Sequence, residues 1–218
     1  MMFYIAKFLV KIAFLIAYRM KTEGRENVPA DTSVIFAANH RTNADPPIVA
    51  AFSRGRHSFM AKEELFTNPV FGWLIRNLGA FPVSRGKGDM GVIDTSVERL
   101  ESGSNLMIFP EGTRSKDGKV HRGHTGAALI SAKSGKPIVP VGICFGEKLS
   151  FRTPITVKYG KPIYPADYVD NREEPNPRQL VKLKNRYMEE IKRLVEGDTE
   201  EKPAESKSGE AAEEQLND

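Results

Sequence analysis

Short apolar runs alternate along the chain with segments in which apolar residues recur at helical spacing. The apolar runs, each bounded by polar or turn-forming residues, lie at residues 33–38, 57–61, 80–84, 105–109, 137–145 and 155–159. The segments with helical spacing lie at residues 45–54, 69–78, 92–102, 123–134 and 177–195. Repetition of a strand followed by a helix is typical of α/β domains. The pattern therefore predicts a single α/β domain with a central, mostly parallel β-sheet flanked by helices.

The first 22 residues form the most hydrophobic segment, and several interpretations are open for it. A membrane-spanning helix needs roughly 20 apolar residues, and Lys7 and Lys11 interrupt this segment. A signal peptide needs an unbroken apolar centre and a small-residue cleavage site, which this segment lacks. A helix packed on its own domain is a third possibility, but the apolar arc is wide for that. We favour an amphipathic helix in the membrane interface, with lysine side chains that reach toward phosphates, anchored by Lys7, Lys11, Phe14 and Arg19.

The net charge of +4 is unevenly distributed along the chain. Residues 197–218 contain eight acidic residues and two lysines, a net charge of −6, which leaves +10 on residues 1–196. This acidic segment has almost no large apolar residue, so we expect it to be disordered. The expected organisation is an interface helix at 1–22, an α/β domain at 23–196 and a disordered tail at 197–218. A basic body indicates an anionic partner: nucleic acid, a phosphorylated metabolite or an acidic membrane.

Polar motifs follow three of the apolar runs directly. They are N-H-R-T-N-A-D at residues 39–45, S-R-G-K-G at 84–88 and P-E-G-T-R-S at 110–115. In a parallel sheet, ligands collect at the carboxyl ends of the strands. We therefore expect the three motifs to lie close together and to form the functional site.

The first motif places His40 and Asp45 five positions apart, with Pro46 after the aspartate. Five residues on a regular helix would separate the two side chains by about 140°, so a strand–turn–helix is the better fit. An aspartate before a proline is a common helix start, which makes Asp45 a candidate N-cap. Asp45 could equally hold the His40 ring, and a histidine with a pKa of about 6.5 can act as a general base near neutrality. Spacing alone leaves the cap and the catalytic pair about equally supported.

The loop after residues 105–109 has the composition of an anion site. Gly112 permits a tight turn, and Thr113 and Arg114 offer hydrogen-bond donors. Arg85 follows the run at 80–84 in a similar position. Two arginines at adjacent strand ends could hold a phosphate, because guanidinium groups bind it with two parallel hydrogen bonds.

Other chemistries find little support in the sequence. His121 and His124 lack further ligands at metal-binding spacing, so we expect no metal, and Arg122 between them is a further candidate anion contact. The chain contains neither a G-x-S-x-G nucleophile elbow nor a P-loop motif. Basic residues are not interleaved with aromatic ones in an RNA-binding pattern, so we expect no nucleic-acid partner. The single cysteine, Cys144, allows no disulfide within the chain and fits a reducing compartment.

Taken together, these motifs resemble the conserved blocks of the 1-acylglycerol-3-phosphate (lysophosphatidate) acyltransferases, within the wider glycerolipid acyltransferase family. The similarity covers residues 24–165, and its four blocks follow the order of the family. They are N-H-R-T-N-A-D at 39–45, G-A-F-P-V-S-R at 79–85, F-P-E-G-T-R-S at 109–115 and I-V-P-V-G-I at 138–143. A single H-x-x-x-x-D motif would be weak evidence, whereas four blocks in order and at suitable spacing are strong.

The resemblance implies a role for each block. His40 would deprotonate the acceptor hydroxyl, and Asp45 would be its partner. The implied phosphate and glycerol site consists of Arg85, Glu111, Gly112, Thr113 and Arg114, with Asn39 and Arg122 as further substrate-binding residues. The implied acyl or catalytic pocket of the fourth block consists of Val139, Pro140 and Val141.

The resemblance also implies the reaction and its partners. The enzyme would transfer a fatty acyl group from acyl-CoA or acyl carrier protein to the lysophosphatidate hydroxyl and form phosphatidic acid. It would need no cofactor beyond that acyl donor, which is a co-substrate. The expected location is the cytoplasmic face of the cell membrane, in contact with lysophosphatidate and anionic phospholipid. The alternatives are an acyltransferase for another lysophospholipid and a non-catalytic protein that binds anionic lipid.

Overall fold

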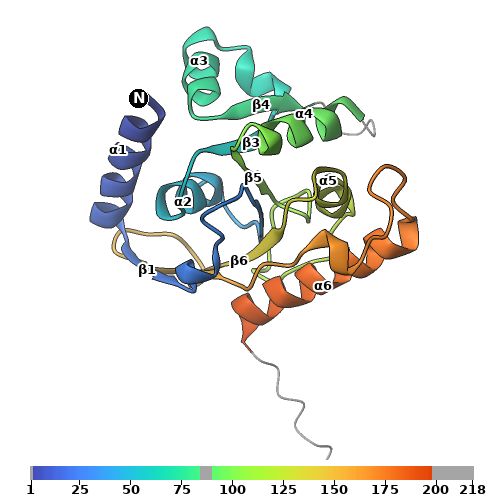
Figure 1. The fold of residues 1–218 in the computed structure, drawn as a ribbon. Coiled ribbons are helices and arrows are strands. Elements are labelled where there is room, and N and C mark those ends of the chain that lie inside the picture. The colour runs from blue at the N-terminus through green and yellow to red at the C-terminus, as the bar shows by residue number, and fades with distance from the viewer. Residues whose placement is uncertain (1, 84–89, 198–218) are drawn as a thin grey trace, which may run out of the picture.

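A computed structural model describes residues 2–83 and 90–197 of the chain. Seven strands form one sheet in the order β1-β7-β6-β2-β5-β3-β4 (Figure 1). Neighbours from β6 to β4 all pair in parallel, whereas β7 pairs antiparallel with β6 and in parallel with β1. The predicted α/β fold with a mostly parallel sheet is therefore confirmed.

The elements follow the predicted alternation of strand and helix. The strands are β1 (Arg19–Glu23), β2 (Ile35–Ala38), β3 (His57–Lys62), β4 (Ala80–Val83), β5 (Asn105–Ile108), β6 (Ile138–Cys144) and β7 (Pro154–Tyr159). The α-helices are α1 (Met2–Ala17), α2 (Asp45–Phe52), α3 (Pro69–Asn77), α4 (Met90–Glu101), α5 (Gly126–Ser134) and α6 (Pro177–Glu196). Short 3-10 helices are η1 (Arg25–Asn27), η2 (Glu63–Phe66) and η3 (Pro165–Asp167).

Helices cover both faces of the sheet because side chains alternate between the faces along each strand. Ile35 and Ala37 of β2 pack into the core under α4, α5 and α6, whereas Phe36 and Ala38 pack into the core under α2. All four β2 residues are completely buried, as expected for a central strand. Figure 1 shows α5 and α6 on one side of the sheet, with α1 and α2 on the other.

The main difference from the predicted elements lies near the N-terminus. The first helix ends at Ala17, and residues 19–23 then form the edge strand β1, so the last residues of the expected interface helix at 1–22 belong to a strand. The sequence of β1, R-M-K-T-E, has no apolar run, because only one of its edges is paired and most of its side chains are exposed. Most of the expected disordered tail, residues 198–218, lies outside the described residues.

None of the helices within residues 2–83 and 90–197 combines the length and the hydrophobicity that a membrane crossing requires.

Candidate active site

His40 and Asp45 form a pair at the carboxyl end of β2. His40 Nδ1 lies 2.8 Å from Asp45 Oδ2, and the aspartate is completely buried. Because a carboxylate only accepts hydrogen bonds, this contact places the hydrogen of a neutral ring on Nδ1 and leaves the lone pair of Nε2 free. The ring stacks on Phe109 with the centroids 4.1 Å apart, which fixes its plane. The pair therefore has the geometry of a general base with an orienting carboxylate.

Asp45 is held by the turn that precedes α2, and it does not cap the helix. Its Oδ2 accepts from the backbone N–H groups of Arg41 and Thr42 at 2.6 and 2.7 Å. Its Oδ1 accepts from the Thr42 hydroxyl at 2.8 Å. The N-cap position belongs to Ala44, so the structure corrects the predicted N-cap role of Asp45. The carboxylate points back toward the strand end, and the same orientation brings it to His40.

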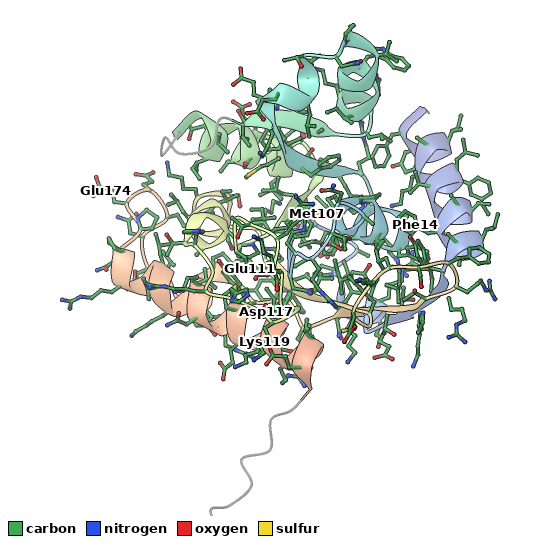
Figure 2. All side chains as sticks on the ribbon, turned by 180° about the vertical axis from the view of Figure 1, so that it is seen from behind. Phe14, Met107, Glu111, Asp117, Lys119 and Glu174 are labelled. Atoms are coloured by element: carbon green, nitrogen blue, oxygen red, sulfur yellow. The ribbon has the colours of Figure 1, made fainter. Side chains whose placement is uncertain are left out.

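Glu111 joins the first and third motifs through the backbone. Its two oxygens accept from the backbone N–H of His40 at 3.1 Å and of His121 at 3.0 Å, and its exposed fraction is 6%. Ser115 N–H in turn donates to the His40 carbonyl at 2.7 Å. Figure 2 shows Glu111 in the interior, between the central sheet and α6. Both oxygens are used within the protein, so Glu111 positions the His40 backbone.

The loop after β5 forms the basic side of a cleft that opens beside His40. Gly112 has a φ of +70°, which confirms the predicted tight turn. Thr113 and Arg114 line the cleft, and Arg114 Nη1 donates to Asn43 Oδ1 at 3.0 Å. The cleft has a volume of about 1390 Å³. Among the described residues, the charged side chains that line it are six cations, Lys7, Arg41, Lys62, Arg114, Lys116 and Lys148, and one carboxylate, Glu147.

Arg41 connects two loops of the site, a function that sequence reasoning missed. Its guanidinium donates to the carbonyls of Phe145 and Gly146 at 2.7 and 2.9 Å. It also lies 4.0 Å above the centroid of the Phe145 ring. The side chain therefore holds the segment after β6 against the turn after β2. The only signal in the sequence is its position next to His40, which says nothing about the direction of its side chain.

The fourth block and Asn39 lie beneath the site, in the core. Val139 and Val141 are completely buried in β6, and Pro140 pairs with Ala37 of β2. The Asn39 amide donates to the Ile143 carbonyl at 3.1 Å and accepts from the Ile143 N–H at 2.7 Å. None of these four residues is among those that line the described cleft, so their pocket and substrate roles stay predictions. They join β2 to β6.

The other two predicted substrate-binding arginines are Arg122 and Arg85. Arg122 is exposed, and it is not among the residues that line the cleft. Arg85 lies outside the described residues. Within the described ranges, no three His, Cys, Asp or Glu side chains gather closely enough to hold a metal ion.

Three of the predicted anchor residues, Lys7, Lys11 and Phe14, lie on the face of α1 that meets the domain. Lys7 Nζ donates to the carbonyls of Ser53 and Gly55 at 2.7 and 2.9 Å, at the C-terminal end of α2. Phe14 packs against the core, as Figure 2 shows, and Arg19 belongs to β1. Lys11 Nζ lies 5.8 Å from the centroid of the Phe52 ring. The outward face of α1 carries exposed apolar residues: Tyr4, Ile5, Phe8, Leu9, Ile12, Leu15 and Ile16.

The junction between α1, α2 and β3 contains two titratable groups with altered pKa values. Burial lowers the pKa of Lys7 to about 8, with smaller effects from the charges of Arg25 and Lys11. Burial also lowers the pKa of His57 to about 3, and the nearby charge of Lys7 lowers it further. His57 Nε2 lies 3.1 Å from the Ser53 hydroxyl. His57 is therefore neutral at pH 7.

Known proteins resemble the chain in sequence and in fold. A family model described as Acyltransferase matches residues 19–144. The chain is 34% identical to a chloroplast 1-acyl-sn-glycerol-3-phosphate acyltransferase of Brassica napus, over 63% of this chain and 41% of that protein. It is 30% identical to the 1-acyl-sn-glycerol-3-phosphate acyltransferase of Bacillus subtilis, over 85% of this chain and 92% of that protein. The chloroplast relatives are longer proteins, and the match spans about two fifths of their length.

A solved structure agrees with these relatives. The crystal structure of the 1-acyl-sn-glycerophosphate acyltransferase PlsC from Thermotoga maritima superimposes with a TM-score of 0.72 at 30% identity. The superposition covers 89% of this chain and 78% of that one. Its motifs, its fold and its relatives therefore agree that this chain belongs to the acyltransferase family of the 1-acyl-sn-glycerol-3-phosphate acyltransferases.

Proposed function

We propose that the protein transfers a fatty acyl group from a thioester donor to the free hydroxyl of 1-acylglycerol-3-phosphate, giving phosphatidic acid. The observation that carries this proposal is the His40–Asp45 pair, 2.8 Å apart, at the wall of a cleft with a basic lining. The names of the relatives support the acceptor. We propose acyl-CoA or acyl carrier protein as the donor, with no cofactor, and the cytoplasmic face of the membrane as the location.

The mechanism follows from the state of the His40 ring. Nε2 takes the proton of the acceptor hydroxyl while the oxygen attacks the thioester carbon. The buried Asp45 carboxylate stabilises the imidazolium that forms. The tetrahedral oxyanion then collapses, the carbon–sulfur bond breaks, and the thiolate leaves and takes the proton from Nε2. A thiolate is a good leaving group, so no covalent acyl-enzyme is required.

The basic side of the cleft supplies the counter-charge for the acceptor. Arg114 and Lys116 follow β5 on the same wall as His40, and Thr113 adds a hydroxyl donor. Guanidinium and ammonium groups bind phosphate by charge-assisted hydrogen bonds. A phosphate held there would place the glycerol hydroxyl toward His40.

The test is an assay of purified protein with lysophosphatidate and each donor in turn. Wild type should form phosphatidic acid, and His40→Ala should lower kcat by about 10²–10⁴-fold, the usual contribution of a general base. The matched control is His121→Ala. His121 also lies 2.8 Å from an aspartate, Asp117, but both side chains are exposed and outside the cleft lining.

The outcomes separate the alternatives. Activity that is lost in His40→Ala and kept in His121→Ala supports the proposal. If the protein acylates a different lysophospholipid and not lysophosphatidate, the proposed acceptor is wrong but the proposed mechanism still applies. Binding of anionic lipid without acyl transfer from either donor would refute the enzymatic proposal.

A further inference from the structure

A second group of exposed apolar side chains lies on η2 and α3. Leu65 is exposed on η2, and Val70 and Trp73 are 76% and 57% exposed on α3. Val70 and Trp73 are three residues apart in the helix, so their side chains share one face. Large apolar side chains gathered on one face of a folded protein mark an interaction surface.

This group borders the same cleft as α1 does. Phe3 and Val10 of α1 line the cleft on one side, and Leu65 of η2 lines it on the other, together with Ile75 of α3. Leu65 thus belongs both to the cleft and to the exposed apolar group. Figure 1 shows α1 and α3 at the same end of the molecule, away from α6. The cleft therefore has an exposed apolar segment on each of two sides.

The charge of the cleft indicates what covers these segments. Within the part of the chain that the structure describes, six cationic side chains and one carboxylate line the cleft between the two apolar segments. A second copy of this chain would bring cations against cations, which is unfavourable. A bilayer with anionic lipids offers apolar chains to the exposed faces and phosphates to the cations. Tryptophan is also enriched where protein meets the membrane–water interface.

We propose that η2 and α3 form a second membrane-contacting element, which inserts Leu65, Val70 and Trp73 beside the outward face of α1. The mouth of the cleft then lies at the bilayer surface, with anionic headgroups next to its cations. The inference rests on the proposed function only in that the acceptor is a membrane lipid.

Trp73 provides the readout, because it is the only tryptophan in the chain. The full-length protein is mixed with vesicles of phosphatidylcholine and phosphatidylglycerol, and flotation measures its binding. We expect the Trp73 emission to shift to shorter wavelength and to be quenched by lipids with brominated acyl chains. An unchanged emission in protein that floats with the vesicles would overturn the proposal, and so would a failure to float.

A pair of matched variants tests the same surface. Val70→Asp should weaken vesicle binding by about tenfold, since it loses an inserted side chain and adds a charge to the interface. Val181→Asp makes the same change at an exposed valine of α6, at the other end of the molecule, and should bind as wild type does. Equal binding by both variants would contradict the proposal.

Two further measurements separate the remaining outcomes. Val70→Asp should keep its activity toward a short-chain lysophosphatidate that is monomeric in water. A loss of this activity as large as the loss of vesicle binding would mean that Val70 contributes to the fold or to catalysis. Sedimentation velocity without lipid should show the same species for wild type and Val70→Asp, whereas a dimer lost in the variant would assign the surface to a second copy. Trp73 quenching needs no acyl transfer, so it can succeed or fail independently of the proposed reaction.

Discussion

The Asp45 carboxylate contacts both His40 and the turn before α2, and measurements on variants can separate these two roles. It orients His40, and it accepts three hydrogen bonds from the turn at Arg41 and Thr42. Asp45→Ala leaves those partly buried donors without their acceptor, so we expect the free energy of unfolding to fall by about 1–3 kcal/mol. His40→Ala removes the proposed general base but leaves the turn intact, and its stability should stay close to that of wild type. Urea denaturation of the two variants measures the difference, and equal stability losses would contradict this division.

Glu111→Gln distinguishes a positioning role from contact with the substrate. The buried carboxylate accepts two backbone N–H groups, whereas a glutamine amide would bring its own N–H₂ against one of them. We expect a loss of about 1–3 kcal/mol in the free energy of unfolding. Because His40 is displaced, we also expect a lower kcat with little change in KM. A raised KM with unchanged stability would restore the substrate-binding role implied by the resemblance.

The sequence predicted those parts of the site in which the type of residue determines its chemistry. Strand ends predicted the turn at Gly112, which has a φ of +70°. Spacing left two roles open for Asp45, the resemblance implied the pair with His40, and the structure places the two side chains 2.8 Å apart. The positioning roles of Asn39 and Glu111 could not be read from spacing. Both are polar residues beside motif residues, and only the direction of the side chain shows that their polar atoms are used by the backbone.

At the scale of the elements, Arg41 connects the turn after β2 to the segment after β6. Arg41→Ala removes charge-assisted hydrogen bonds to the carbonyls of Phe145, Gly146 and Glu147. We expect faster hydrogen exchange of the backbone amides of residues 145–149, with unchanged exchange in the β6 core. Because this segment also lines the cleft, KM should rise as well. Exchange in 145–149 that matches wild type would show that other contacts hold the segment.

At the junction of α1, α2 and β3, His57 makes the stability of the folded protein depend on pH. The pKa of His57 is about 3 in the folded protein, below its ordinary value of 6.5, so the unfolded chain binds the proton more readily. Stability from this site is fully present above pH 6.5 and is lost as the pH falls from 6.5 toward 3. We expect the free energy of unfolding, measured by urea denaturation, to fall more between pH 7 and about pH 4.5 in wild type than in His57→Gln. Equal losses of stability in the two proteins would exclude His57 as the cause of the pH dependence.

The elements themselves differ in how clearly the sequence reveals them. The central strands were found because burial on both faces requires unbroken apolar runs, as in β2. Strand β1 was missed because it lies at an edge and its residues are mostly polar. The orientation of α1 could not be predicted because a lysine can face solvent or a helix end, and here Lys7 donates to two carbonyls just after α2. Helical periodicity separates the two faces of α1 but does not say which one meets the domain.

For the whole molecule, the parallel sheet explains why distant segments share one cleft. The segments that follow β2, β5 and β6 all meet at the carboxyl ends of these strands, as expected for an open α/β sheet. Each segment contributes cations: Arg41 after β2, Arg114 and Lys116 after β5, and Lys148 after β6. The positive charge is therefore a property of the sheet edge and not of any single motif.

This charge predicts how membrane binding responds to salt. Each lysine or arginine near an anionic bilayer contributes about 1 kcal/mol at low ionic strength, and added salt screens that attraction. Binding to phosphatidylglycerol-containing vesicles should weaken by about tenfold or more between roughly 0.05 and 0.5 M salt. Lys62→Gln and Lys148→Gln should each make the dependence shallower, because both side chains line the cleft. Pure phosphatidylcholine vesicles serve as the control, since only the apolar faces of α1 and α3 can contribute there. Equal salt dependence on both kinds of vesicle would mean that the cleft cations do not face the headgroups.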